Sequence, residues 1–314
     1  MRVAYCLIGI VGSVNYGMGL GKDIDYRLAH YWNKKNIFDI NKDVDVFMHS
    51  WSVEHEDGLR EIYNPKKAKF EKQIDFGQET IRDNSIASRW YSTAICNQLR
   101  QVYEEEQGIV YDVVMFFRYD HVFLIPLDFS KFDMSYIWMR HGRPVGHIDG
   151  VRQVDNVEMN IDTTEDVDLS THEARRNFNL YPRETVYDSF IFSNSKNIDI
   201  YSEIYGYLSE EDSKINSPHE EICLQFKRNN VWDKLDFCFF GETETEAIRA
   251  LYKNPEHVDK EFDIKKFNKF ENEYVRQNPE VIKRFKGTIN TMTDELEFND
   301  LDITKSGFQT EKVQ

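Results

Sequence analysis

The chain is poor in cysteine, which limits the classes of site that it can build. Cysteine occurs only four times in 314 residues, at widely spaced positions, and no C-x-x-C pair is present. A zinc or redox motif is therefore disfavoured. We expect Cys6, Cys96, Cys223 and Cys238 to be ordinary core thiols, as in a reducing cytoplasm.

Long apolar runs and an excess of positive charge are also lacking. No stretch approaches the roughly 20 apolar residues of a transmembrane helix, and the short apolar run at the start has no signal-peptide cleavage pattern. With 55 acidic against 39 basic residues the net charge is -16, which disfavours broad attachment to DNA or to an anionic membrane. We therefore expect a cytoplasmic protein without a membrane span, with one small basic cluster at Lys66, Lys67 and Lys69.

The residues that are present support a large folded core. Apolar residues make up 40% of the chain and aromatic residues 14%. Short apolar runs alternate with longer segments of helical periodicity, a pattern typical of an α/β fold. Strands are predicted at Val3–Val11, Val44–Met48, Val113–Phe117, Tyr136–Met139, Val186–Ser193 and Leu235–Phe240, and helices at Ile24–Trp32, Ile86–Glu106, Ile198–Leu208 and Glu220–Lys227.

The most informative stretch is the apolar run Val113–Phe117, which leads directly into Arg118, Tyr119 and Asp120. A run of this kind is typical of a strand covered on both faces of a mostly parallel sheet. Ligands bind at the carboxyl ends of such strands. We therefore interpret Asp120 as a ligand for a metal or a sugar and Arg118 as a partner for an anion such as diphosphate. The alternative is an internal salt bridge.

Two other predicted strands also end in residues that suit a binding site. Gly12 and Ser13 follow the first strand in a glycine-bearing loop, which fits neither the P-loop pattern nor G-x-G-x-x-G but could approach a nucleotide. His49 and Trp51 follow the second strand. The alternatives are a flexible loop in the first case, and a satisfied core histidine beside a buried aromatic in the second.

A further carboxylate, Asp188, begins the later strand Y-D-S-F-I-F-S. It could orient a sugar hydroxyl or act as a base, and the alternative is a solvated charge at a strand end. His219, Glu220 and Glu221 stand at a predicted helix start, where acidic residues suit the helix dipole without any further function.

Four segments in order resemble a family of small glycosyltransferase-like proteins of bacteria, phages and large viruses. They are C-L-I-G-I-V-G-S, D-V-F-M-H-S-W, Y-D-V-V-M-F-F-R-Y-D and Y-D-S-F-I-F-S-N-S-K-N-I-D-I-Y, and together they span roughly residues 3 to 208. The third is similar to an R-x-D variant of the family's D-x-D element, because Arg118 stands where the first aspartate would be.

The resemblance implies a GT-A-like fold, a single Rossmann-type α/β unit with a mostly parallel sheet. That domain would cover residues 1–252, with a polar, irregular insertion at 140–183, and residues 253–314 would form a charged helical extension with a disordered tail. The resemblance also implies transfer of a sugar from a nucleotide-diphosphate donor, often with Mn²⁺ or Mg²⁺. Gly12, Ser13, His49, Trp51 and Arg118 would contact the donor.

In this interpretation Asp120 would hold the metal, and Asp188 would contact the sugar or serve as the base. The acceptor stays open among a glycan, a lipid-linked sugar, a protein and a modified nucleobase in DNA, as do the inverting and retaining routes. Two other functions also remain open: a non-catalytic nucleotide- or carbohydrate-binding protein of the same fold, and a nucleotidyltransferase that makes the activated sugar.

Overall fold

The computed structural model describes residues 1–11, 26–77, 81–123, 125–140, 146–148, 151–153, 170–180, 186–208, 217–238 and 245–247. Gly12 and Ser13 lie outside the described residues. So does the predicted C-terminal extension, residues 253–314.

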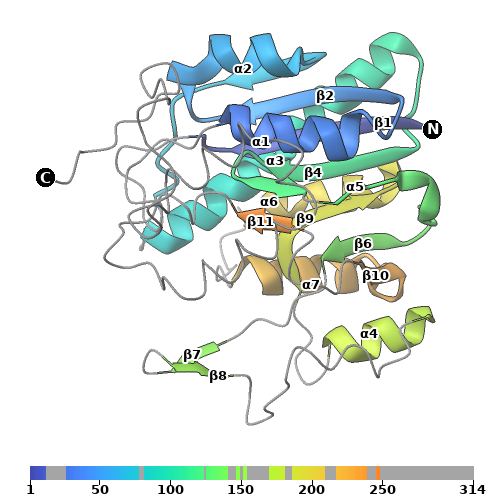
Figure 1. The fold of residues 1–314 in the computed structure, drawn as a ribbon. Helices are drawn as coiled ribbons and strands as arrows, with labels where there is room; N and C mark the ends of the chain where they lie inside the picture. The colour runs from blue at the N-terminus through green and yellow to red at the C-terminus, as the bar shows by residue number, and fades with distance from the viewer. Residues whose placement is uncertain are drawn as a thin grey trace, which may run out of the picture.

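A seven-stranded sheet forms the centre of the molecule, with strand order β10-β6-β9-β4-β1-β2-β3 (Figure 1). Strand β9 runs antiparallel to both of its neighbours, and every other pair is parallel. Six strands therefore point the same way, which confirms the predicted mostly parallel α/β sheet. The strands are β1 (Arg2–Gly9), β2 (Asp43–Ser50), β3 (Lys67–Phe70), β4 (Val113–Arg118), β6 (Ile137–Arg140), β9 (Tyr187–Ser193) and β10 (Leu235–Cys238).

Both faces of the sheet are buried, and strand β1 shows how. Successive side chains of a strand point to opposite faces. Ala4, Cys6 and Ile8 accordingly join one core cluster, while Tyr5 and Leu7 join the other. This double burial explains why β1 and β4 read as continuous apolar runs. All four cysteines are buried and free, as expected from their spacing.

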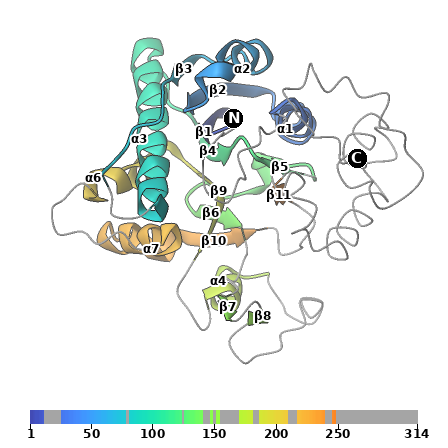
Figure 2. The same ribbon diagram turned by 90° about the vertical axis from the view of Figure 1, so that its left-hand side faces the viewer.

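Helices cover the two faces of the sheet. Helix α3 (Ile81–Gln107), with α5 (Ser195–Ser202), α6 (Ile204–Leu208) and α7 (Pro218–Arg228), lies on one face, and α1 (Tyr26–Asn33) with α2 (Glu56–Tyr63) lies on the other (Figure 2). The helix predicted over Ile198–Leu208 is two helices that break at Glu203. Short 3-10 or π-helical segments occupy Lys34–Phe38, Val53–His55, Phe129–Lys131 and Trp232–Lys234. None of the described helices is long and apolar enough to cross a membrane.

The predicted irregular segment 140–183 contains regular structure where it is described. It holds a short hairpin, β7 (Gly146–Ile148) with β8 (Val151–Gln153), and helix α4 (His172–Leu180). Arg175 of α4 donates two hydrogen bonds to the fully buried Asp236 of β10, at 2.8 and 2.5 Å. A buried carboxylate needs such a partner, so this bidentate pair fixes α4 to the edge of the sheet.

A second pair of short strands extends the fold beside the end of β4. Strand β5 (His121–Phe123) pairs antiparallel with β11 (Thr245–Ala247). Because β5 follows Asp120 directly, this ribbon carries the chain away from the carboxyl end of β4.

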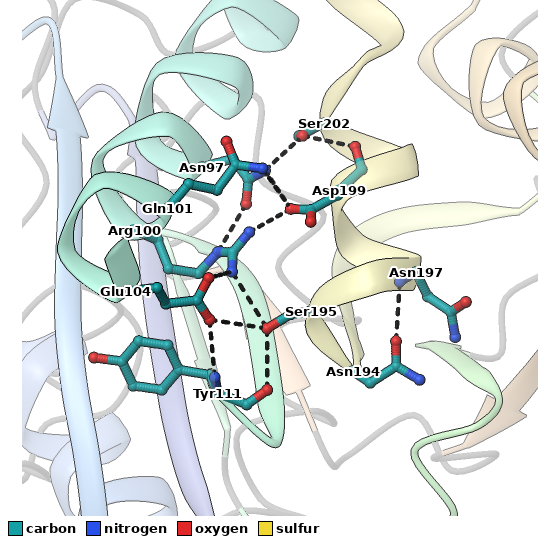
Figure 3. Close-up of polar contacts among 10 residues, drawn as sticks. All are labelled: Asn97, Arg100, Gln101, Glu104, Tyr111, Asn194, Ser195, Asn197, Asp199 and Ser202. Atoms are coloured by element: carbon teal, nitrogen blue, oxygen red, sulfur yellow. Dashed lines mark hydrogen bonds and ion pairs between the residues drawn. The ribbon is translucent and has the colours of Figure 1, made fainter. Parts of the chain in front are cut away.

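A buried polar network joins α3 to α5 (Figure 3). The Arg100 side chain is fully buried and donates to Asn97, Glu104, Ser195 and Asp199. A buried guanidinium is tolerated only when its donors are satisfied. The network therefore locks the two helices together, three turns along α3 from Arg89.

Candidate active site at the carboxyl edge of the sheet

The carboxyl edge of the sheet gathers charged residues from distant parts of the sequence. Arg118 ends β4, and Asp120 follows it after one residue. Because β9 is antiparallel to β4, its first residues lie at the same edge, and they include Asp188. The sequence-predicted Arg118, Asp120 and Asp188 are thus brought to one edge by the strand order.

Arg118 and Asp120 form a bidentate ion pair. The Nε atom of Arg118 donates to Oδ1 at 2.8 Å, and Nη2 donates to Oδ2 at 2.6 Å. Asp120 is 3% exposed, whereas the Arg118 side chain is 25% exposed. Among the described residues, Nη1 of Arg118 has no hydrogen-bond partner. The salt bridge considered as the alternative therefore exists, and it leaves one end of the guanidinium available to an anion.

Asp188 lies on an irregular part of β9. Met139 of β6 pairs with Ile191, but the next residue, Arg140, pairs with Tyr187, so residues 188 to 190 are extra. Bulges of this kind re-aim side chains and are frequent next to active sites. Here the bulge turns Asp188 toward α3, where Arg89 holds its Oδ2 atom and its carbonyl oxygen.

The electrostatic surroundings keep Asp188 ionised. Burial would raise the pKa of Asp188, but the charges of Arg89, His219, Arg118 and His121 outweigh it and hold the pKa below its ordinary value. The same proximity acts on Arg89: burial would lower its pKa, yet Asp188, Tyr201 and Asp120 raise it. Both groups are therefore charged at neutral pH.

These residues form what we call the carboxyl-edge cluster: Arg89, Arg118, Asp120, Asp188 and His219. Its two arginines balance its two aspartates, so the cluster carries no net charge when His219 is neutral. The Arg118 and His219 side chains are its more exposed members, at 25% and 28%. The more exposed Arg118 and His219 side chains can thus face a ligand, while the ion pairs of the cluster lie deeper in the protein.

His49 and Trp51, the other sequence-predicted site residues that the structure describes, lie in a separate group at the end of β2. His49 is fully buried, with Nδ1 2.7 Å from Ser92 Oγ and Nε2 3.0 Å from Glu71 Oε1. Burial lowers the pKa of His49, with Lys69 adding to that effect and Glu71 opposing it. Because both ring nitrogens are engaged, His49 can position its neighbours but has no free nitrogen for a ligand.

Trp51 belongs to an aromatic cluster at the same place. Its ring stacks on Tyr91 with centroids 5.3 Å apart and planes at 25°, and Phe76 packs against both rings. Trp51 is 6% exposed. It is thus largely covered by protein, with a small accessible edge.

The end of β1 and helix α3 connect the carboxyl-edge cluster with the group around His49 at the end of β2. The Gly9 amide donates to Ser92 Oγ at 3.1 Å, and the Val11 amide donates to Ser52 Oγ at 3.0 Å, so the end of β1 lies against α3 and the end of β2. Ser92 and Arg89 are three residues apart on α3, hence on one face of the helix. Helix α3 therefore contacts the carboxyl-edge cluster through Arg89 and the group at the end of β2 through Ser92.

The described residues do not by themselves build a metal site. They contain no group of three or more His, Cys, Asp and Glu side chains that could hold a metal ion. Asp120 and Asp188 are already engaged by Arg118 and Arg89. The predicted divalent cation stays a prediction.

Two members of the cluster were not identified from the sequence. Arg89 lies within the predicted helix Ile86–Glu106, where the periodic pattern marks only the apolar positions, and His219 stands at a predicted helix start that needs no further function. Only the tertiary structure identifies these two residues, because the bulge in β9 and the approach of α7 bring them close to Asp188. The sequence shows only that each is a charged or titratable residue near a strand or helix end.

Comparisons with known proteins give distant structural similarities only. No family model matches the sequence, and no curated protein does. A glycosyltransferase involved in glycosylation of the major capsid of PBCV-1 is 8% identical, with a TM-score of 0.36 over 76% of this chain and 81% of that one. The glycosyltransferase GlyE of Streptococcus pneumoniae TIGR4 is 10% identical, with a TM-score of 0.36 over 76% of this chain and 45% of that one.

An enzyme of another kind is equally similar. The 4-diphosphocytidyl-2C-methyl-D-erythritol synthase of Anaerococcus prevotii DSM 20548 is 10% identical, with a TM-score of 0.36 over 76% of this chain and 86% of that one. At such low identity, these similarities assign no activity to this chain.

Proposed function

We propose that this protein is a glycosyltransferase that moves a sugar from a nucleoside-diphosphate donor to an acceptor hydroxyl. The observation that carries the proposal is the free Nη1 end of Arg118 at the carboxyl edge of the sheet, held in place by the buried Asp120. The four family-like segments support it, because three of them contribute residues to this edge: His49 and Trp51, Arg118 and Asp120, and Asp188.

In the proposed reaction the donor diphosphate lies against Arg118. As the bond between the anomeric carbon and the diphosphate oxygen breaks, negative charge develops on the leaving group, and a positioned guanidinium stabilises that charge. Asp120 keeps Arg118 in one orientation, which removes the need to reorganise during the reaction. Trp51 and Tyr91 would place an aromatic surface beside the nucleotide base.

A ligand screen tests this function directly. We expect nucleoside-diphosphate sugars to raise the melting temperature, since a ligand at 100 times its Kd stabilises the native state by about 2.7 kcal/mol. The screen is run with and without Mn²⁺, which also tests the predicted cation. Stabilisation by a nucleoside triphosphate plus sugar phosphate, but not by nucleotide sugars, would instead identify a nucleotidyltransferase. Binding of a nucleotide sugar without any release of diphosphate would identify a non-catalytic binding protein.

A further inference from the structure

Strand β1 lies between the two groups that the proposed function uses. In the sheet, β4 with Arg118 flanks it on one side, and β2, which leads to Trp51, flanks it on the other (Figure 1). Ile8 of β1 pairs with Arg118, and Gly9 pairs with Ser50, the residue before Trp51. Neighbouring strands are about 4.8 Å apart, so the ends of β4 and β2 are separated by roughly 10 Å. A ligand that contacts both of them must therefore cross the end of β1.

Gly9 ends β1, and the space beside it is open. Gly9 is half-buried, and apart from its chain neighbours no heavy atom of the described residues lies within 4 Å of the position that a Cβ atom would take. Its amide donates to Ser92 Oγ at 3.1 Å, and its carbonyl oxygen accepts from the Trp51 amide at 3.2 Å. Because both backbone groups of Gly9 are engaged, the end of the strand is fixed in place.

We infer that the ribose of the donor lies over Gly9, and that a side chain at this position would occupy the place of the sugar ring. The inference deepens the proposed function and rests on it, because that function places the diphosphate at Arg118 and the base beside Trp51. The ribose is the part of a nucleoside diphosphate that joins the other two, and β1 is the strand between their contacts. Glycine allows a ligand to approach the backbone closely. Gly9 is thus a specificity-determining residue, which admits a nucleoside diphosphate across the end of β1.

The backbone of Gly9 gives a second reason for glycine. Its φ is +105°, a conformation that residues with a side chain rarely adopt. The two reasons predict different results. Backbone strain arises with the Cβ atom and changes little with a longer side chain, whereas obstruction of a ribose grows with the length of the side chain. The open space gives the longer side chain room in the protein itself.

The first test compares Gly9→Ala with Gly9→Leu. Calorimetry measures the Kd values of UDP, GDP, ADP and CDP. For the nucleotides that wild type binds, the Kd should rise about 10-fold in Gly9→Ala and about 100-fold in Gly9→Leu, because overpacking of an occupied space grows with volume. The free energy of unfolding should fall equally in both variants. Inorganic pyrophosphate lacks the ribose, so its Kd should be the same in both variants as in wild type.

The matched control is Gly108→Ala. Gly108 also has a positive φ, +62°, and no heavy atom of the described residues within 4 Å of a Cβ position. It follows the last residue of α3, and the chain then reaches the start of β1, where the Asp112 amide donates to the carbonyl oxygen of Arg2. Gly108 is therefore at the other end of β1. Gly108→Ala should lose stability and bind nucleotides like wild type.

Three results would overturn the inference. Wild-type nucleotide Kd values in Gly9→Leu would show that no ribose lies there. Equal weakening in Gly9→Ala and Gly9→Leu would show that backbone strain is the whole effect. Loss of pyrophosphate binding in step with nucleotide binding would show that the substitutions displace the diphosphate contact instead of obstructing the ribose.

The second test needs no variant. A nucleoside diphosphate that carries a diazirine on its ribose should, on irradiation with wild type, label the peptide that contains Gly9, as identified by mass spectrometry. If wild type binds the nucleotide and the labelled peptides lack Gly9, the inference fails and the proposed function stands. If wild type binds none of the four nucleoside diphosphates, the proposed function fails, and the role of Gly9 fails with it.

Discussion

At the residue scale, Trp51 offers a direct probe of nucleotide binding. Its indole stacks on Tyr91 and keeps a small exposed edge. A nucleoside diphosphate bound at the carboxyl edge should quench the protein's tryptophan fluorescence, and Trp51→Phe should remove most of that change. Trp232→Phe, on a different element, is the matched control and should leave the quenching intact. Equal quenching in wild type and Trp51→Phe would contradict the stacking role.

His49 should make stability depend on pH. Its folded pKa lies below its ordinary value of 6.5 because the ring is buried. The unfolded chain therefore binds more protons than the folded protein as the pH falls through 6.5, so stability should decline from there downward. Urea unfolding between about pH 7.5 and about pH 5.5, roughly one unit to either side of the ordinary pKa, measures this decline.

The matched variant is His49→Gln, which lacks the titrating ring. Its free energy of unfolding should fall less steeply over the same interval, although some slope persists because burial also lowers the pKa of His30. The same slope in wild type and His49→Gln would show that His49 does not carry this effect.

At the scale of elements, the strands with the strongest apolar runs could be predicted from the sequence. β1, β2, β4 and β9 all lie where the apolar runs placed them, because burial on both faces leaves a clear pattern. β3 was not predicted, since its sequence K-A-K-F has only two apolar residues and reads as a basic cluster. It is an edge strand, and edge strands often carry lysine.

The site was predictable only in part, for the same physical reason. Arg118 and Asp120 follow a strand with a continuous apolar run, so their position at the carboxyl edge of the sheet could be inferred from the sequence. The direction in which Asp188 points could not, because it depends on a bulge set by pairing between β9 and β6. Arg89 and His219 reach the cluster through helix packing, which leaves no local signal. The donor role of Gly12 and Ser13 stays a prediction.

The network around Arg100 should matter for stability and not for chemistry. Arg100→Met leaves Glu104 and Asp199 without their buried partner, so it should lower the free energy of unfolding by about 3–5 kcal/mol. Gln98→Ala, at an exposed position of the same helix, is the control and should change it by no more than about 0.5 kcal/mol. Urea denaturation measures both. A loss below 1 kcal/mol, roughly the value of an exposed pair, would contradict this account.

At the scale of the whole molecule, donor and acceptor functions should separate. Removing residues 154–169 from the polar insertion leaves α4 fixed to β10 through Arg175 and Asp236. We expect this deletion to abolish transfer and to spare donor hydrolysis, since long polar insertions between strands commonly carry binding residues. Truncation from Thr288 should spare donor hydrolysis. If the insertion deletion changes neither activity, the insertion has no acceptor role.

The most direct test of the central claim measures release of nucleoside diphosphate from a panel of nucleotide sugars by wild type and Asp120→Asn. The amide presents a donor to Arg118 in place of an acceptor, so the guanidinium loses its fixed orientation, and turnover should fall by orders of magnitude while the fold is retained. Asp57→Asn, an exposed change on α2, is the control and should turn over like wild type. Wild-type turnover by Asp120→Asn would contradict the assignment of the active site to the carboxyl edge of the sheet.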